Sequence, residues 1–111
     1  MAAAPGAGRL VGDEVGTGRG EHPVCGDEVE VDVRCRDGRI DALRWRAAGC
    51  PASHAVAAVA GAVLEGVPTA EAAAALHRAL GERGGLGAHE RHAEAMFGRA
   101  LAAALAAAAG R

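Results

Sequence analysis

Three potential metal ligands lie beside glycine residues in two short motifs. Cys25 and Asp27 are separated by one glycine, and Cys50 lies between Gly49 and Pro51. Thiolates and carboxylates bind zinc, and a thiolate is also the reactive form of cysteine that takes up sulfur. Glycine allows the backbone to turn tightly between two ligands or to approach them closely. Either motif alone is common by chance, so metal or sulfur chemistry here depends on both acting at one site.

A hairpin of two strands separates these motifs. Residues 29–35 and 43–47 each alternate between apolar and polar side chains, which is the pattern of half-buried strands. The Asp-Gly pair at 37–38 predicts a tight turn between them. The polar faces of the two strands carry opposite charges, which predicts exposed cross-strand ion pairs. The residues concerned are Glu30, Asp32, Arg44 and Arg46.

Three helices are expected after the hairpin. Pro51 suits the first position of a helix, and apolar residues then recur at helical spacing. A second helix is predicted from Thr69, acting as its N-cap, to Gly81, and a third over residues 88–109. The partial positive charge at the start of the first helix favours a thiolate at Cys50. A small antiparallel sheet packed against C-terminal helices is an α+β fold.

Composition excludes several classes of function. The 111 residues include 12 basic and 14 acidic ones, and the aromatic residues are one Trp and one Phe, so neither a basic patch nor a stacking platform for nucleic acid is expected. The sequence has no apolar run of about 18 residues and no signal peptide, which predicts a cytoplasmic protein away from membranes. Three cysteines make a disulfide framework improbable, and Cys35 is expected to be a core residue.

The N-terminal segment is rich in glycine. Residues 1–20 contain six glycines, and this density makes an ordered backbone entropically expensive. The sequence therefore predicts a flexible arm over residues 1–20 and one α+β domain over residues 21–111.

The order of motifs resembles the iron–sulfur cluster scaffold family that includes IscU, SufU and the N-terminal domain of NifU. The resemblance extends from about residue 20 to residue 105. It rests on Pro23-Val24-Cys25-Gly26-Asp27, Gly49-Cys50-Pro51-Ala52-Ser53, Leu64-Glu65-Gly66, Thr69-Ala70-Glu71-Ala72, Arg91-His92-Ala93 and Ala100-Leu101.

This resemblance implies a ligand set. Cys25 and Asp27 match the family's first cysteine and its aspartate, Cys50 matches the second cysteine, and His92 matches the histidine before the third cysteine. The third cysteine itself is replaced by Ala93. The four remaining ligands suit tetrahedral zinc, and they also suit a 2Fe–2S cluster because histidine can replace cysteine on iron.

Other histidines are weaker candidates. His89 lies one turn earlier on the last helix, and His54 lies one turn after Cys50 on the same helix face, so each is an alternative nitrogen ligand. His22 and His77 are expected to face solvent.

Three functions follow from the resemblance and its gaps. The first is a non-enzymatic scaffold or carrier for a transient 2Fe–2S cluster, with a cysteine desulfurase and iron–sulfur recipient proteins as partners. The second is a zinc-binding protein in sulfur transfer or with structural zinc. The third is a degenerate scaffold that acts only through protein–protein contacts, since the third cysteine is missing and the family's docking segment is altered at residues 86–90.

Overall fold

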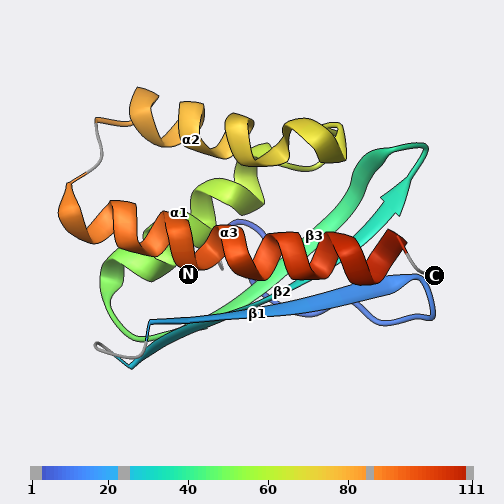
Figure 1. Ribbon diagram of the computed structural model, residues 1–111, viewed down its shortest axis with the longest axis horizontal. Coiled ribbons are helices and arrows are strands. Elements are labelled where there is room, and N and C mark those ends of the chain that lie inside the picture. The colour runs from blue at the N-terminus through green and yellow to red at the C-terminus, as the bar shows by residue number, and fades with distance from the viewer. Residues whose placement is uncertain (1–3, 23–25, 85–86, 110–111) are drawn as a thin grey trace.

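A three-stranded antiparallel sheet forms one layer of the protein (Figure 1). The structure is a computed structural model that describes residues 4–22, 26–84 and 87–109. Strands β1 (Val15–His22), β2 (Asp27–Arg36) and β3 (Arg39–Ala48) lie in the order β1-β2-β3. The predicted hairpin is β2–β3, and both residues of its two-residue turn have positive φ, 56° at Asp37 and 74° at Gly38. This backbone is the one that Asp-Gly favours between twisted strands.

Helices α1 (Pro51–Val63), α2 (Ala72–Glu82) and α3 (Ala88–Ala109) follow, as predicted. The prediction that Thr69 is the N-cap of the second helix is wrong. Thr69 begins a short 3₁₀ turn, η1 (Thr69–Glu71), and α2 starts after Glu71. The Thr69 N–H donates to the Gly38 carbonyl at 2.9 Å, so this segment is bound to the hairpin turn before α2 can begin.

Two of the helices cover one face of the sheet. α3 lies along β1 and β2, α1 lies on β3, and α2 packs against α1 on the side away from the sheet (Figure 1). Val31, Val33, Leu43 and Phe97 are almost fully buried between these layers. The predicted α+β fold, with an antiparallel sheet packed against helices, is confirmed.

Strand β1 corrects the prediction of a flexible arm, because residues 15–20 are part of the sheet. Gly16, Gly18 and Gly20 all face α3. A Cβ atom at these positions would lie 2.3, 2.0 and 2.2 Å from backbone carbonyl oxygens of α3. The alternate glycines therefore let a helix backbone rest directly on a strand, which is a packing requirement rather than a sign of disorder.

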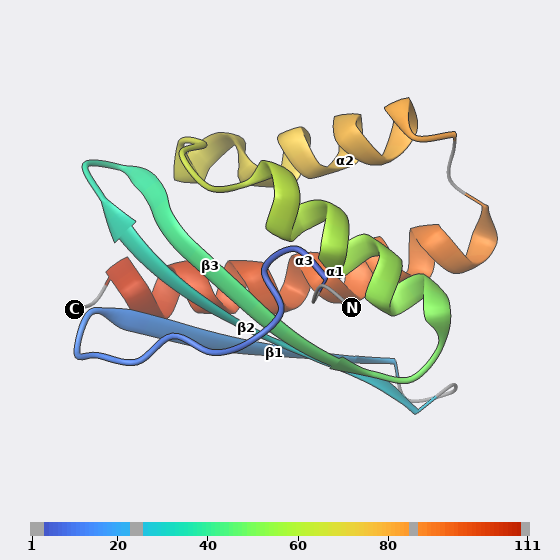
Figure 2. The ribbon, with the colours of Figure 1, turned by 180° about the vertical axis from the view of Figure 1, so that it is seen from behind.

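The chain before β1 is also ordered over its described residues. The Trp45 N–H donates to the Gly6 carbonyl at 2.9 Å, the Gly8 N–H donates to the Trp45 carbonyl at 3.0 Å, and the Trp45 indole donates to the Pro5 carbonyl at 2.7 Å. This segment covers part of the free edge of β3 and then crosses the outer face of the sheet (Figure 2).

The predicted cross-strand ion pairs form only in part. Arg46 contacts both Glu30 and Asp32, whereas Arg44 pairs with Glu65. Asp32 was predicted to face solvent, but it is only 3% exposed, because the crossing segment covers it and the Leu10 N–H donates to its carboxylate.

Among the described residues, no helix is long and apolar enough to cross a membrane.

Candidate functional site

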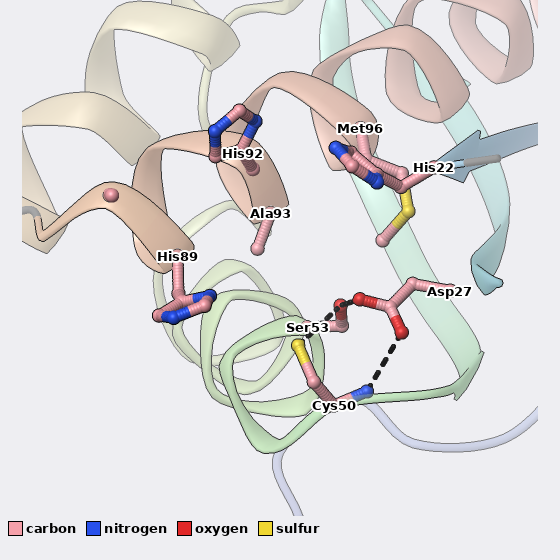
Figure 3. A pocket seen from close by; sticks show the side chains of 9 residues that line it. His22, Asp27, Cys50, Ser53, His89, His92, Ala93 and Met96 are labelled. Carbon is pink, nitrogen blue, oxygen red and sulfur yellow. Dashed lines mark hydrogen bonds between the residues drawn. The ribbon is translucent and has the colours of Figure 1, made fainter. Parts of the chain in front are cut away.

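One pocket lies where β1 ends and where β2, α1 and α3 begin (Figure 3). Its volume is about 270 Å³. The lining residues are His22, Asp27, Cys50, Ser53, Ala88, His89, His92, Ala93 and Met96. The fold therefore brings three of the four predicted ligands, Asp27, Cys50 and His92, to one place, and the fourth, Cys25, lies outside the described residues.

Asp27 joins the start of β2 to the start of α1. Its carboxylate accepts a hydrogen bond from the Cys50 backbone N–H at 2.9 Å and one from the Ser53 hydroxyl at 3.3 Å. The pKa of Asp27 is lowered by hydrogen bonding from the Cys50 thiol, then from the Cys50 N–H, against the opposing effect of burial, with smaller contributions from Ser53 and the charge of His22. Asp27 is thus an ionised oxygen donor that is held in place while lone pairs remain for a metal.

Gly49 makes this arrangement possible. Its φ is +125°, a conformation that side chains rarely adopt, and a Cβ atom here would lie 2.0 Å from the Asp27 Oδ1. The glycine next to Cys50 is therefore required twice, for the backbone conformation and for the close approach of the carboxylate.

Cys50 occupies the N-cap position of α1. Its backbone is extended (φ −72°, ψ 159°) and Pro51 follows as the first helical residue, as the sequence predicted. The Cys50 Sγ lies 3.7 Å from the Ser53 Oγ, and Figure 3 shows it facing the pocket. A second cavity, lined by α1 residues 51, 52 and 55 together with His89, also opens beside Cys50. The half-buried thiol can therefore be reached from two sides.

Histidines form the opposite wall. His89 and His92 come from the first turns of α3, and His22 comes from the end of β1. The prediction that His22 faces solvent is wrong: it is half-buried and lines the pocket, because the β1–β2 register places it opposite Asp27. The alternative ligand His54 is not part of this lining, and its ring contacts Trp45 instead.

Ser53 is a residue of the site that the motifs did not indicate. Ser53 is 2% exposed and lies about one turn after Cys50 on α1, where its hydroxyl donates to Asp27. The spacing from Cys50 is visible in the sequence, but the contact with Asp27 depends on the fold. Cys35 lies half-buried against the core, as expected, and burial raises the pKa of its thiol. Cys35 and Cys50 are both free thiols.

Similarity to known proteins agrees with this geometry. The model of the NifU-like N terminal domain family matches residues 5–111. The chain belongs to this family. The resemblance inferred from the motifs is thereby confirmed.

Two curated relatives of this family member come from Archaeoglobus fulgidus. They are named iron-sulfur cluster assembly scaffold proteins IscU 1 and IscU 2, and each is 30% identical over 94 residues. The match covers 84% of this chain and 61% of each relative. The chain thus spans about three fifths of their length.

Solved structures share the fold. The N-terminal part of a nitrogen-fixing NifU-like protein from Brucella abortus has a TM-score of 0.60 at 20% identity, covering 96% of this chain and 80% of that one. A second crystal structure, of a hypothetical protein, has a TM-score of 0.57 at 24% identity, covering 84% and 70%.

The donor types in the pocket fit a metal ion, although the side chains are not yet gathered around one point. Sulfur, oxygen and nitrogen donors line the same pocket, and together they are a set of donor types that zinc and iron accept. Within the part of the chain that the structure describes, no three His, Cys, Asp or Glu side chains are close enough together to hold one ion.

Proposed function

We propose that this chain is an iron–sulfur cluster assembly scaffold or carrier, which holds iron or a transient 2Fe–2S cluster through Cys25, Asp27, Cys50 and His92. The observation that carries the proposal is the meeting of Asp27, Cys50 and His92, from three different elements, at one pocket. Membership of the NifU-like N-terminal family and the scaffold function named for the A. fulgidus relatives support it.

The ligand types suit a cargo that must be released. The Cys50 thiolate binds iron strongly, whereas a carboxylate is a harder and weaker ligand for a cluster. Asp27 already has two hydrogen bonds to α1, so it returns to a stable arrangement when the cluster leaves. The protein then needs to hold and hand over a cluster rather than catalyse a reaction.

The proposal also assigns partners. A cysteine desulfurase would supply sulfur to Cys50, and iron–sulfur recipient proteins would take the finished cluster. The exposed position of His89 and His92 and the cavity on the outer side of Cys50 leave this end of the molecule open to such a partner.

Anaerobic reconstitution of the full chain with ferrous iron and sulfide tests the proposal. We expect visible absorbance from a cluster in the wild type and in Cys35→Ala, which removes a thiol outside the pocket. Cys50→Ala is expected to lose most of this absorbance. An absence of absorbance in the wild type, or an equal amount in Cys50→Ala, would contradict the proposal.

A zinc-bound form is the second candidate, because three imidazoles surround the pocket and neutral imidazole nitrogen is a common zinc ligand. In that case the protein acts in sulfur transfer or carries structural zinc. Elemental analysis of the protein as purified distinguishes the zinc-bound form from the iron–sulfur scaffold. Stoichiometric zinc that is lost in Cys50→Ala supports the second candidate, and zinc-free protein contradicts it.

A further inference from the structure

Ser53 is the only serine in the chain, and it is 2% exposed on the wall of the pocket. It lies in the first turn of α1, a helix that consists mainly of alanine and valine. Alanine has a higher helix propensity than serine, and burial of a hydroxyl is unfavourable unless it forms a hydrogen bond. Helix stability and core packing therefore do not account for a hydroxyl group at this position.

The Ser53 hydroxyl contacts both the oxygen donor and the sulfur donor at the start of α1. It donates to the Asp27 Oδ2 at 3.3 Å, and its Oγ lies 3.7 Å from the Cys50 Sγ. Figure 3 shows Ser53 beside both side chains. A hydroxyl has one proton and two lone pairs, so it can donate to a carboxylate and accept from a thiol at the same time. One side chain thus contacts two of the proposed ligands.

The hydrogen bond from Ser53 fixes the orientation of the Asp27 carboxylate. The Cys50 backbone N–H donates to Oδ1 at 2.9 Å, and Ser53 donates to Oδ2, so the carboxylate is held at both oxygens. Asp27 is only 7% exposed, which leaves little water to replace a missing donor. Without the Ser53 hydroxyl, one oxygen of the carboxylate loses the bond that positions it.

We propose that Ser53 is a positioning residue for cargo uptake, which orients Asp27 and Cys50 before iron or a cluster binds. This inference rests on the proposed function, because it assumes that these two side chains bind the cargo. Ser53 itself does not bind the metal in this scheme. Partners that orient a ligand in this way typically contribute about 10–100-fold to metal affinity.

Titration of the metal-free full chain with Co²⁺, under reducing and anaerobic conditions, tests this role. Co²⁺ replaces ferrous iron as an optical probe, because its absorbance reports binding to a thiolate. We expect Ser53→Ala to weaken Co²⁺ binding about 10–100-fold. Ser53→Thr keeps the hydroxyl and adds one methyl group to a side chain that borders the cavity, so it should restore binding close to that of the wild type.

Thr17→Ala is the matched control. The Thr17 hydroxyl donates to Asp32 at 2.8 Å, so this variant also removes a hydrogen bond from a hydroxyl to a buried carboxylate, but neither residue lines the pocket. We expect its Co²⁺ affinity to equal that of the wild type. Circular dichroism and chemical denaturation establish that each variant is folded and compare the stabilities.

Three outcomes are decisive. Wild-type Co²⁺ affinity in a folded Ser53→Ala protein, with binding lost in Cys50→Ala, would overturn this inference and leave the proposed function intact. Equal weakening in Ser53→Ala and Ser53→Thr would also overturn it, because the hydroxyl would then not be the group responsible. Absence of Co²⁺ binding through Cys50 in the wild type would instead overturn metal uptake by the pocket, and with it the proposed function.

Discussion

Replacement of Gly18 by alanine is expected to separate α3 from β1. A Cβ atom at Gly18 would lie 2.0 Å from the Ala100 carbonyl oxygen and 2.5 Å from the Ala104 nitrogen, and both belong to the α3 backbone. Neither atom can rotate away as a side chain would. The helix must therefore retreat by about 1.4 Å, from 2.0 Å to the 3.4 Å at which ordinary van der Waals contact begins.

The energetic cost follows from this displacement. A radial gap of 0.5–1 Å already removes roughly a quarter to a half of the dispersion attraction between facing atoms. Overpacking of a tight interface costs about 1–3 kcal/mol, and the backbone contacts here place Gly18→Ala at the upper end. Alanine regains about 0.5–1 kcal/mol because glycine is entropically unfavourable in a strand. We expect a net loss of about 2–2.5 kcal/mol, or roughly 10 °C in Tm for a chain of this length.

Chemical denaturation measures this loss. The single tryptophan, Trp45, is 4% exposed in the core, so its fluorescence reports the sheet, while far-ultraviolet circular dichroism reports the helices. Gly98→Ala is the matched control, because Gly98 lies in α3 and a Cβ atom there would meet no heavy atom within 4 Å outside its own helix backbone. That variant should be more stable by about 0.8–1.0 kcal/mol. A Gly18→Ala protein as stable as the wild type would refute the close-packing argument.

Two further predictions concern the site and the buried ion pair. Gly49→Ala is expected to destabilise the protein by about 1–3 kcal/mol, because alanine is strained at this positive φ. It should also lower metal affinity, because the added Cβ atom displaces the Asp27 carboxylate. Unchanged Co²⁺ binding in this variant would contradict the second expectation. Asp32→Asn is expected to cost about 1.5–3 kcal/mol at neutral pH, since it removes the charge and one acceptor oxygen from the bidentate pair with Arg46, while Glu30 remains beside the guanidinium. Burial alone would raise the pKa of Asp32, but hydrogen bonds from Arg46, Leu10 and Thr17 hold it below its ordinary value. The contribution of this pair is therefore complete above about pH 4 and is lost as the pH falls through the lowered pKa. Denaturation at a series of acidic pH values should show a steeper loss in the wild type than in Asp32→Asn, and parallel curves would refute the assignment.

Much of the fold could be predicted from side-chain patterns within single elements. The alternation in residues 29–35, the Asp-Gly turn and the position of Pro51 each specify a local backbone, and β2, β3 and α1 agree with them. Local signals also placed Cys50 at the start of a helix.

Other features depended on partners that are distant in the sequence. The composition of the N-terminal segment predicted disorder, because it is rich in glycine. The alternate glycines of β1 instead make room for the backbone of α3, which lies at the other end of the chain. Asp32 belongs to the polar face of its strand, and it is buried because the chain before β1 crosses that face.

The candidate site divides in the same way. Residue types and motif spacing indicated the sulfur, oxygen and nitrogen donors, because both are local properties of the chain. The hydrogen bond from the start of α1 to Asp27 and the contact between the rings of His22 and His92 became visible in the packed fold alone. Strand register and helix–strand distance set those contacts, and both arise from packing between elements that no local pattern encodes.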